Sequence, residues 1–421
     1  MVNFKDLSYE EIAGYIFIAS ISFTVFAPAV HYIGFALCLI FLVYGQVRYK
    51  HSIFKIDVWG KERGIEVLLL AFFIWSAFPH IPATANFHSW GRGASVYLEM
   101  LIWYLLTIRL LGSSVWRWKY ISIFVPSTTI IFCMIISVST FGWFPMFHNL
   151  RMNINVLGLY AMMALPYIFY YALWHLEKKV VVKYAVCIIC LIAAFISFSS
   201  GAWLTIFIMM PLIIYFALIH KKLTMKNIIF CLCLCAVALT AVNCVSKGAL
   251  LKRFYGEVSQ VTALQDLDSL TNHRYSIWRG TIKMILGRPL TGYGRDSFDA
   301  EHERLLATDK ELAEATQVFD YAHNMYLELA FAGGIPSAIL FCVVLIIFLK
   351  KCLNNCNMIE NGIPWYMIHL TLLVGMVVYG LTGDVFEARR DLAVIFWTSL
   401  GIIRVMPKRN PNDSPDKMLC D

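Results

Sequence analysis

Charged residues are scarce in this chain. Only 15% of its 421 residues are Asp, Glu, Lys or Arg, whereas an average soluble domain carries about 25%. The alternation of apolar and polar residues that marks half-buried strands is also missing. A chain that is 59% hydrophobic and has no strand pattern can satisfy its backbone inside a bilayer only as helices. The sequence therefore predicts an all-α, polytopic integral membrane protein.

Cysteine is absent from the longest polar segment, residues 247–323, although the chain contains 12 cysteines. That segment therefore holds no disulfide framework. Three of the thiols, Cys231, Cys233 and Cys235, stand close together in an apolar stretch. No His or carboxylate stands beside them, so their spacing favours packing inside a helix over a metal site.

Apolar runs recur along the whole chain, each long enough to cross a hydrocarbon layer of roughly 30 Å. Lys and Arg concentrate in every second connection, as they do in cytoplasmic loops, which predicts both termini on the cytoplasmic side. The net charge of +8 follows this membrane pattern and does not indicate a nucleic-acid partner. We predict about 12 transmembrane helices, at residues 10–28, 31–47, 65–82, 93–112, 118–140, 153–174, 180–199, 202–219, 226–246, 324–349, 364–383 and 391–405.

One connection on the predicted outer side is far longer than the others. Residues 247–323 form a loop of about 75 residues, and loops of that length are usually functional. Its residues 274–286 predict an amphipathic helix that ends at Gly287 and Pro289. A Gly292-Tyr293-Gly294 turn and a charged helical stretch, 297–314, follow. The apolar face predicted for the first helix consists of Ile277, Trp278, Thr281, Ile285 and Leu286.

This loop divides the chain into three parts. Residues 1–246 hold predicted transmembrane helices 1–9, and residues 247–323 form a periplasmic catalytic loop with amphipathic helices. Residues 324–421 hold transmembrane helices 10–12 and a cytoplasmic tail.

The sharpest polar cluster is Tyr321-Ala322-His323-Asn324, where the long loop re-enters the membrane. An imidazole titrates near pH 6.5, so His323 is a candidate general base that could deprotonate a sugar hydroxyl. The alternative is an interfacial histidine that caps the next helix together with Asn324. Glu328 lies one turn inside that helix, where an ionisable residue marks a functional site by default.

Four arginines lie on the predicted outer side, where loops normally carry few Lys and Arg residues: Arg274, Arg279, Arg389 and Arg390. Guanidinium groups bind phosphate through bidentate, charge-assisted hydrogen bonds, so these residues predict a pyrophosphate site at the membrane surface. The alternative for Arg274 and Arg279 is pairing with acidic residues of the loop. Arg151 with Asn155 forms a fainter polar patch at the outer end of another predicted span.

Three motifs in this order resemble those of the O-antigen ligase family. Ser199-Ser200-Gly201-Ala202-Trp203-Leu204 is similar to the family's Ser-Arg-Gly-Ala-Trp-Leu signature. The segment from His273 through Gly292-Tyr293-Gly294 resembles its loop helix and following turn. Ala322-His323-Asn324 with Ala332-Gly333-Gly334-Ile335 resembles its His-Asn re-entry motif and Gly-Ile. One departure is Ser200, where the family usually has an arginine that a serine cannot replace as a bidentate phosphate ligand.

The resemblance implies a GT-C-like, metal-independent glycosyltransferase that needs no cofactor. It lies in the bacterial inner membrane with its active site facing the periplasm. The donor would be a glycan on undecaprenyl pyrophosphate, and the acceptor would be lipid A–core oligosaccharide. By the same resemblance His323 would activate the acceptor hydroxyl, with Arg274 and Arg279 as candidates for the pyrophosphate. We predict an inverting displacement.

Two other functions stay open at this point. O-antigen polymerases belong to the same superfamily and extend a second lipid-linked glycan instead. A polysaccharide or lipid transporter would belong to another class, but transporters often show repeated halves and broken helices near the bilayer midplane. The sequence shows neither, and its polar residues gather near one predicted face.

Overall fold

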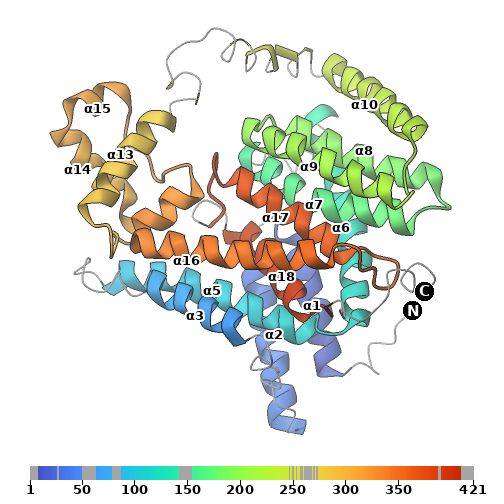
Figure 1. Cartoon of the computed structure of the whole chain (residues 1–421), viewed down its shortest axis with the longest axis horizontal. Coiled ribbons are helices and arrows are strands. Elements are labelled where there is room, and N and C mark those ends of the chain that lie inside the picture. The colour runs from blue at the N-terminus through green and yellow to red at the C-terminus, as the bar shows by residue number, and fades with distance from the viewer. Residues whose placement is uncertain are drawn as a thin grey trace.

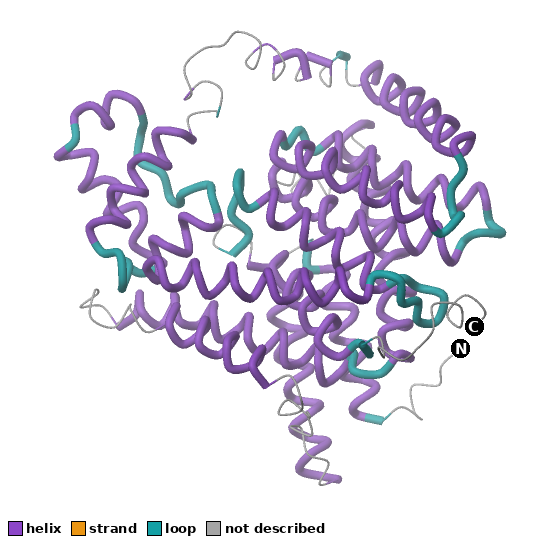
Figure 2. The backbone as a smooth tube through the Cα atoms, in the orientation of Figure 1, coloured by secondary structure: helices purple, strands orange, loops and turns teal. Residues whose placement is uncertain are grey.

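The computed structural model describes residues 8–25, 28–49, 63–77, 87–141, 154–245, 274–386 and 390–408, with a few isolated positions between 247 and 271. The elements named within these residues are all helices (Figure 2). The prediction of an all-α fold is confirmed for the part of the chain that is described.

Each predicted span overlaps one helix of the described residues. Seven of the described helices are long and apolar enough to cross a membrane: α2, α5, α6, α7, α9, α10 and α16. The chain is thus a multi-pass membrane protein, while the number of twelve spans stays a prediction. The helices are α1 (Tyr9–Phe23), α2 (Pro28–Tyr49), α3 (Arg63–Ala77), α5 (Phe87–Leu110), α6 (Ser114–Phe141), α7 (Ile154–His175), α8 (Val180–Ile196), α9 (Ser200–Ile219), α10 (Met225–Val245), α16 (Met325–Asn355), α17 (Trp365–Tyr379) and α18 (Arg390–Val405).

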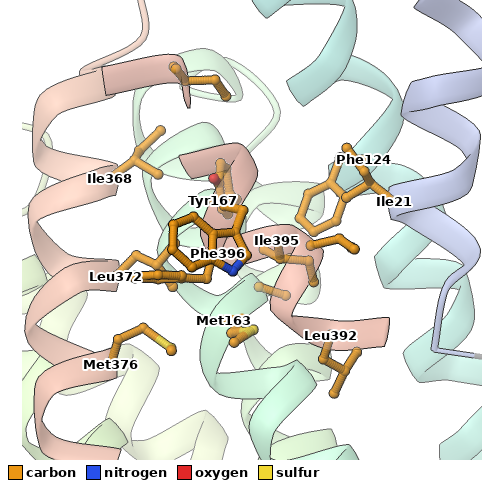
Figure 3. Close-up of a cluster of buried hydrophobic side chains, with 14 of the residues drawn as sticks. Ile21, Phe124, Met163, Tyr167, Ile368, Leu372, Met376, Leu392, Ile395 and Phe396 are labelled. Carbon is orange, nitrogen blue, oxygen red and sulfur yellow. The ribbon is translucent and has the colours of Figure 1, made fainter. Parts of the chain in front are cut away.

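Helix α7 forms the centre of the bundle. In its apolar stretch 94% of the residues are buried, whereas none is buried in the apolar stretch of α10. Helix α10 lies at the edge of the molecule (Figure 1). In the core, Met163 and Tyr167 of α7 lie among Leu372 and Met376 of α17 and Phe396 of α18 (Figure 3). Close packing of this kind is the main force between helices in a bilayer, where lipid tails are as apolar as leucine.

From residue 274 onward, the long loop forms short helices over one end of the bundle (Figure 1). Helix α13 (Arg274–Gly287) occupies the range predicted for the amphipathic helix, and that prediction is confirmed. Three residues of its predicted apolar face are buried, but Leu286 is 68% exposed. The charged stretch forms two helices, α14 (Phe298–Thr308) and α15 (Lys310–Ala315), because the Asp309 side chain between them accepts the Leu312 N–H and caps α15. We call α13, α14 and α15 the cap.

The Gly292-Tyr293-Gly294 turn docks the cap onto α16. The N–H groups of Tyr293 and Gly294 donate to the carbonyls of Phe331 (2.8 Å) and Ala332 (3.0 Å). Gly292 has a φ of +65°, and a Cβ there would lie 2.5 Å from the Phe331 oxygen. Gly334, with a φ of +76°, interrupts α16 at this contact. Both glycines are required by a close backbone approach, and we call this contact the Gly334 joint.

The opposite end of the bundle is tied by ion pairs. Arg117 forms one with Glu360, at 2.7 Å. Further pairs join the ends of helices that the charge pattern places on one side of the membrane: Arg109–Glu10, Lys222–Glu177 and Arg404–Glu66. We call this end the basic end and the end beneath the cap the pocket end. Which of them faces the periplasm stays a prediction.

Candidate active site

A pocket of about 400 Å³ lies at the pocket end, where five distant segments of the chain meet. These are the starts of α7, α9 and α13, the turn before α16 and the turn after α17. The lining residues are Asn155, Leu159, Ser199, Gly201, Arg274, Tyr321, His323, Tyr379, Thr382, Gly383 and Asp384.

Residue His323 is held in an uncommon backbone conformation on the turn before α16. Its φ is +52°, which a residue other than glycine adopts only when its surroundings impose it. The buried Glu328 carboxylate accepts the Ala322 N–H at 2.7 Å. On the other side the Asn324 side chain accepts the N–H groups of Tyr326 and Leu327 and caps α16. Glu328 and Asn324 thus position the imidazole.

The turn after α17 is bonded to the turn that carries His323. The Met325 N–H donates to the carbonyls of Gly380 (2.8 Å) and Gly383 (3.1 Å), and the Asn324 amide donates to the Leu381 carbonyl at 3.2 Å. These contacts bring Asp384, which accepts the Phe386 N–H, to the lining of the pocket. Two turns more than 50 residues apart in sequence therefore form one rigid wall of the pocket.

Small residues allow α9 to begin directly against this wall. A Cβ on Gly201 would lie 2.7 Å from the Thr382 hydroxyl, and one on Gly158 would lie 2.7 Å from the Ser199 Cβ. The first turn of α9 is thus wedged between α7 and the turn after α17. The Ser-Ser-Gly-Ala segment owes its small side chains to this packing.

Two helix N-termini lie at the pocket, those of α7 and α9, which begin at Ile154 and Ser200. The N–H groups and the dipole at such ends are favourable for anions. Helix α13 also begins there, but its first N–H groups donate to Thr271 and Asp268. Ser199 does not cap α9 with its side chain. Its hydroxyl instead donates to the Asn155 side chain at 3.2 Å. Together with the Arg274 guanidinium, these ends suit a phosphate-bearing ligand.

The imidazole of His323 is neutral at pH 7. Burial, and to a smaller extent the charge of Arg274, lower its pKa from 6.5 to about 4. The rings of Tyr321 and Phe319 pack against it, with centroids 4.2 Å and 5.8 Å away. Burial and the nearby Asp384 carboxylate raise the pKa of the Tyr321 phenol, so this hydroxyl keeps its proton. A neutral imidazole can accept a proton, and a protonated phenol can donate a hydrogen bond.

A comparison with known protein families finds a match that includes part of this pocket. Residues 185–342 match the family model described as O-Antigen ligase. The chain carries an O-antigen ligase family domain. No curated protein matches the chain. The matched stretch runs from α8 into α16 and includes the pocket residues Ser199, Gly201, Arg274, Tyr321 and His323. The resemblance seen in the motifs is confirmed over this stretch, and the members of that family are membrane glycosyltransferase-like enzymes that act on lipid-linked glycans.

Within this O-antigen ligase domain and its neighbours, the structure gathers three of the residues predicted from sequence. Asn155, Arg274 and His323 line the pocket. Ser200 starts α9 between two lining residues but is not itself part of the lining.

Arg279 lies apart from the pocket. It forms an ion pair with Glu311 of the cap at 2.9 Å, the kind of loop pairing that the sequence left open as the alternative. Arg151 and Arg389 fall outside the described residues, as does the side chain of Arg390, which begins α18. Within the described ranges, no group of three or more His, Cys, Asp or Glu side chains is placed to hold a metal ion.

Sequence reasoning missed the residues that the C-terminal helices bring to the pocket. Tyr379, Thr382 and Asp384 line it from the end of α17 and the following turn. A possible signal was the Thr-Gly-Asp run directly after a long apolar helix, because an isolated carboxylate at a helix end needs a reason.

Proposed function

We propose that this protein is an O-antigen ligase, which transfers O-antigen polysaccharide from undecaprenyl pyrophosphate to lipid A–core oligosaccharide. The observation that carries the proposal is the pocket shared by a neutral His323 and a cationic Arg274 at the starts of α7 and α9. It places an imidazole that can take a proton beside a guanidinium that can bind a diphosphate.

In this mechanism the diphosphate of the donor binds against Arg274 and the N–H groups at the start of α9. Donors fixed where charge develops stabilise the departing pyrophosphate. The acceptor hydroxyl attacks the anomeric carbon from the face opposite the diphosphate. The new bond joins the acceptor oxygen to that carbon, the bond from the carbon to the phosphate oxygen breaks, and the configuration inverts.

His323 takes the proton of the attacking hydroxyl and later releases it to water. Its low pKa makes it a weak base in the empty pocket. The negative charge of a bound diphosphate offsets the effect of Arg274 and raises the basicity of the imidazole. Donor binding and base strength are therefore linked through Arg274.

An assay with purified components tests this proposal. The protein in lipid nanodiscs receives an undecaprenyl-pyrophosphate-linked glycan, with or without lipid A–core. A ligase makes a core-linked product only when the core is present. Elongated lipid-linked glycan in the reaction without core would instead identify a polymerase. NMR of the anomeric centre in donor and product tests inversion, and a retained configuration contradicts it.

A transporter is separated from an enzyme by His323→Ala. We expect this variant to lose product formation. Flux of labelled lipid-linked glycan that continues in the variant, with no product formed by the unsubstituted protein, would support transport.

A further inference from the structure

A second cavity lies at the other end of the bundle. It is an apolar groove lined by residues of α7, α8, α9 and α10. Each helix supplies part of the wall, for example Leu173, Cys187, Ile213 and Cys235. Leu173 lies two residues before the basic end of α7, whereas the active-site pocket is formed at the start of that helix.

The groove faces outward along α10. Leu232 lines it and is 63% exposed, and no residue in the apolar stretch of α10 is buried. In a multi-pass membrane protein such a surface faces acyl chains. The groove is therefore open to a chain that enters sideways from the bilayer.

One buried ammonium group borders the groove. Lys183, in the first turn of α8, is only 6% exposed. Its positive charge acts on the thiols of Cys187 and Cys231, which both line the groove. It stands 5.0 Å from the centroid of the Tyr184 ring. Among the described residues no carboxylate forms an ion pair with it, whereas Lys222 nearby is paired with Glu177.

A buried charge without a counter-ion is unfavourable, so the environment of Lys183 calls for an anion. The connections around it carry far more positive than negative charge. Between residues 175 and 228 the basic end carries one acidic residue, Glu177. Against it stand six lysines: Lys178, Lys179, Lys183, Lys221, Lys222 and Lys226.

We propose that the groove binds an anionic glycerophospholipid, with one acyl chain between α8, α9 and α10 and its phosphate against Lys183. Basic pockets between transmembrane helices are typical sites for acidic lipid headgroups. The polyprenyl donor is a poorer candidate, because its diphosphate has to reach Arg274 at the opposite end of the bundle. The lipid fills the space that α10 leaves beside the core and joins α10 to it. The choice of a phospholipid over the polyprenyl donor rests on the proposed function, whereas the binding of an anionic lipid in the groove does not.

Native mass spectrometry of the full-length, delipidated protein tests the site. It is titrated with phosphatidylglycerol or phosphatidylcholine of the same acyl chains. The unsubstituted protein should retain phosphatidylglycerol about tenfold better, the size expected for one charge-assisted contact. Lys183→Gln should abolish this preference, Lys183→Arg should keep it, and the exposed Lys178→Gln is the matched control. Cys235→Trp, which fills the groove, should weaken the binding of both lipids.

Three outcomes would overturn the proposal. The first is equal retention of the two lipids by the unsubstituted protein. The second is an unchanged preference in Lys183→Gln. The third is displacement of bound phosphatidylglycerol by undecaprenyl phosphate at equal concentration, which would assign the groove to the donor. If Lys183→Gln does not fold, the other two variants still test the site. Binding in the groove predicts that Lys183→Arg keeps phosphatidylglycerol and that Cys235→Trp weakens its binding, whereas a site elsewhere predicts no difference between them.

Discussion

The two ends of the helical bundle use charge in different ways. At the basic end, ion pairs join the ends of helices, as in Arg117–Glu360 and Arg404–Glu66. At the pocket end, Arg274 lies with a neutral histidine and the starts of α7 and α9 around a cavity. Ion pairs between helix ends fasten the helices together, whereas side chains that line a cavity can contact a ligand. Substitutions at the two ends should therefore separate stability from activity.

The largest effect is expected for His323→Ala. Loss of a general base lowers turnover by about 10²–10⁴-fold, and the donor should still bind because Arg274 is intact. Product formation by purified protein measures the loss, and binding of a labelled donor measures retention. His175→Ala, an exposed histidine at the basic end, is the control. Comparable losses in the two variants would remove the distinction between the ends.

Arg274→Gln follows, with an expected loss of about 10²–10³-fold, as for the removal of one preorganised electrostatic contact in an active site. Its matched control is Arg279→Gln on the same helix, which breaks only the exposed pair with Glu311 and should change the rate by less than about twofold. Equal losses would place both arginines on the donor and contradict the separation seen in the structure.

At the basic end, Arg117→Met should affect stability alone. The guanidinium is 3% exposed and also donates to the carbonyls of Leu111 and Gly112. Removing one partner of such a buried pair costs about 3 kcal/mol. The midpoint of thermal unfolding in detergent should fall while activity per folded molecule stays unchanged. A drop in specific activity with unaltered unfolding would contradict this assignment.

The smallest expected effect is a displaced limb in the pH profile. His323 must be neutral to act as a base, so activity falls when the pH drops through its pKa. That pKa is about 4 in the empty pocket, which places the acid limb of kcat/KM near pH 4. The limb of kcat, which reports the enzyme–substrate complex, should lie higher because the bound diphosphate counters Arg274. A kcat/KM limb near pH 6.5 would mean that His323 is not buried as described.

The sequence was a good guide to the helices and to His323 with Arg274. Runs of apolar residues are long and separated by charged connections, so each predicted span has a helix in the structure. The motif residues were found because they are local in sequence. Asp384 and Tyr379 were missed, since their place in the pocket depends on the packing of α17 against α9, which no local pattern specifies.

Helix geometry separates Arg274 from Arg279, although the sequence predicted that both belong to one pyrophosphate site. Residues five apart on an α-helix are separated by about 140° around its axis. Arg274 starts α13 at the pocket, while Arg279 extends from another side toward Glu311. The role of Arg279 in donor binding stays a prediction, and the paired variants above test it.

The Gly334 joint separates the pocket-forming start of α16 from the part of the helix that crosses the bundle. Residues 325–333 are bonded to the cap through the carbonyls of Phe331 and Ala332, whereas the remainder of α16 runs on through the bundle. A long membrane helix adjusts its tilt to the local bilayer thickness. We expect this tilt to be absorbed at the joint, so that the imidazole and guanidinium keep their separation in thick and thin membranes alike.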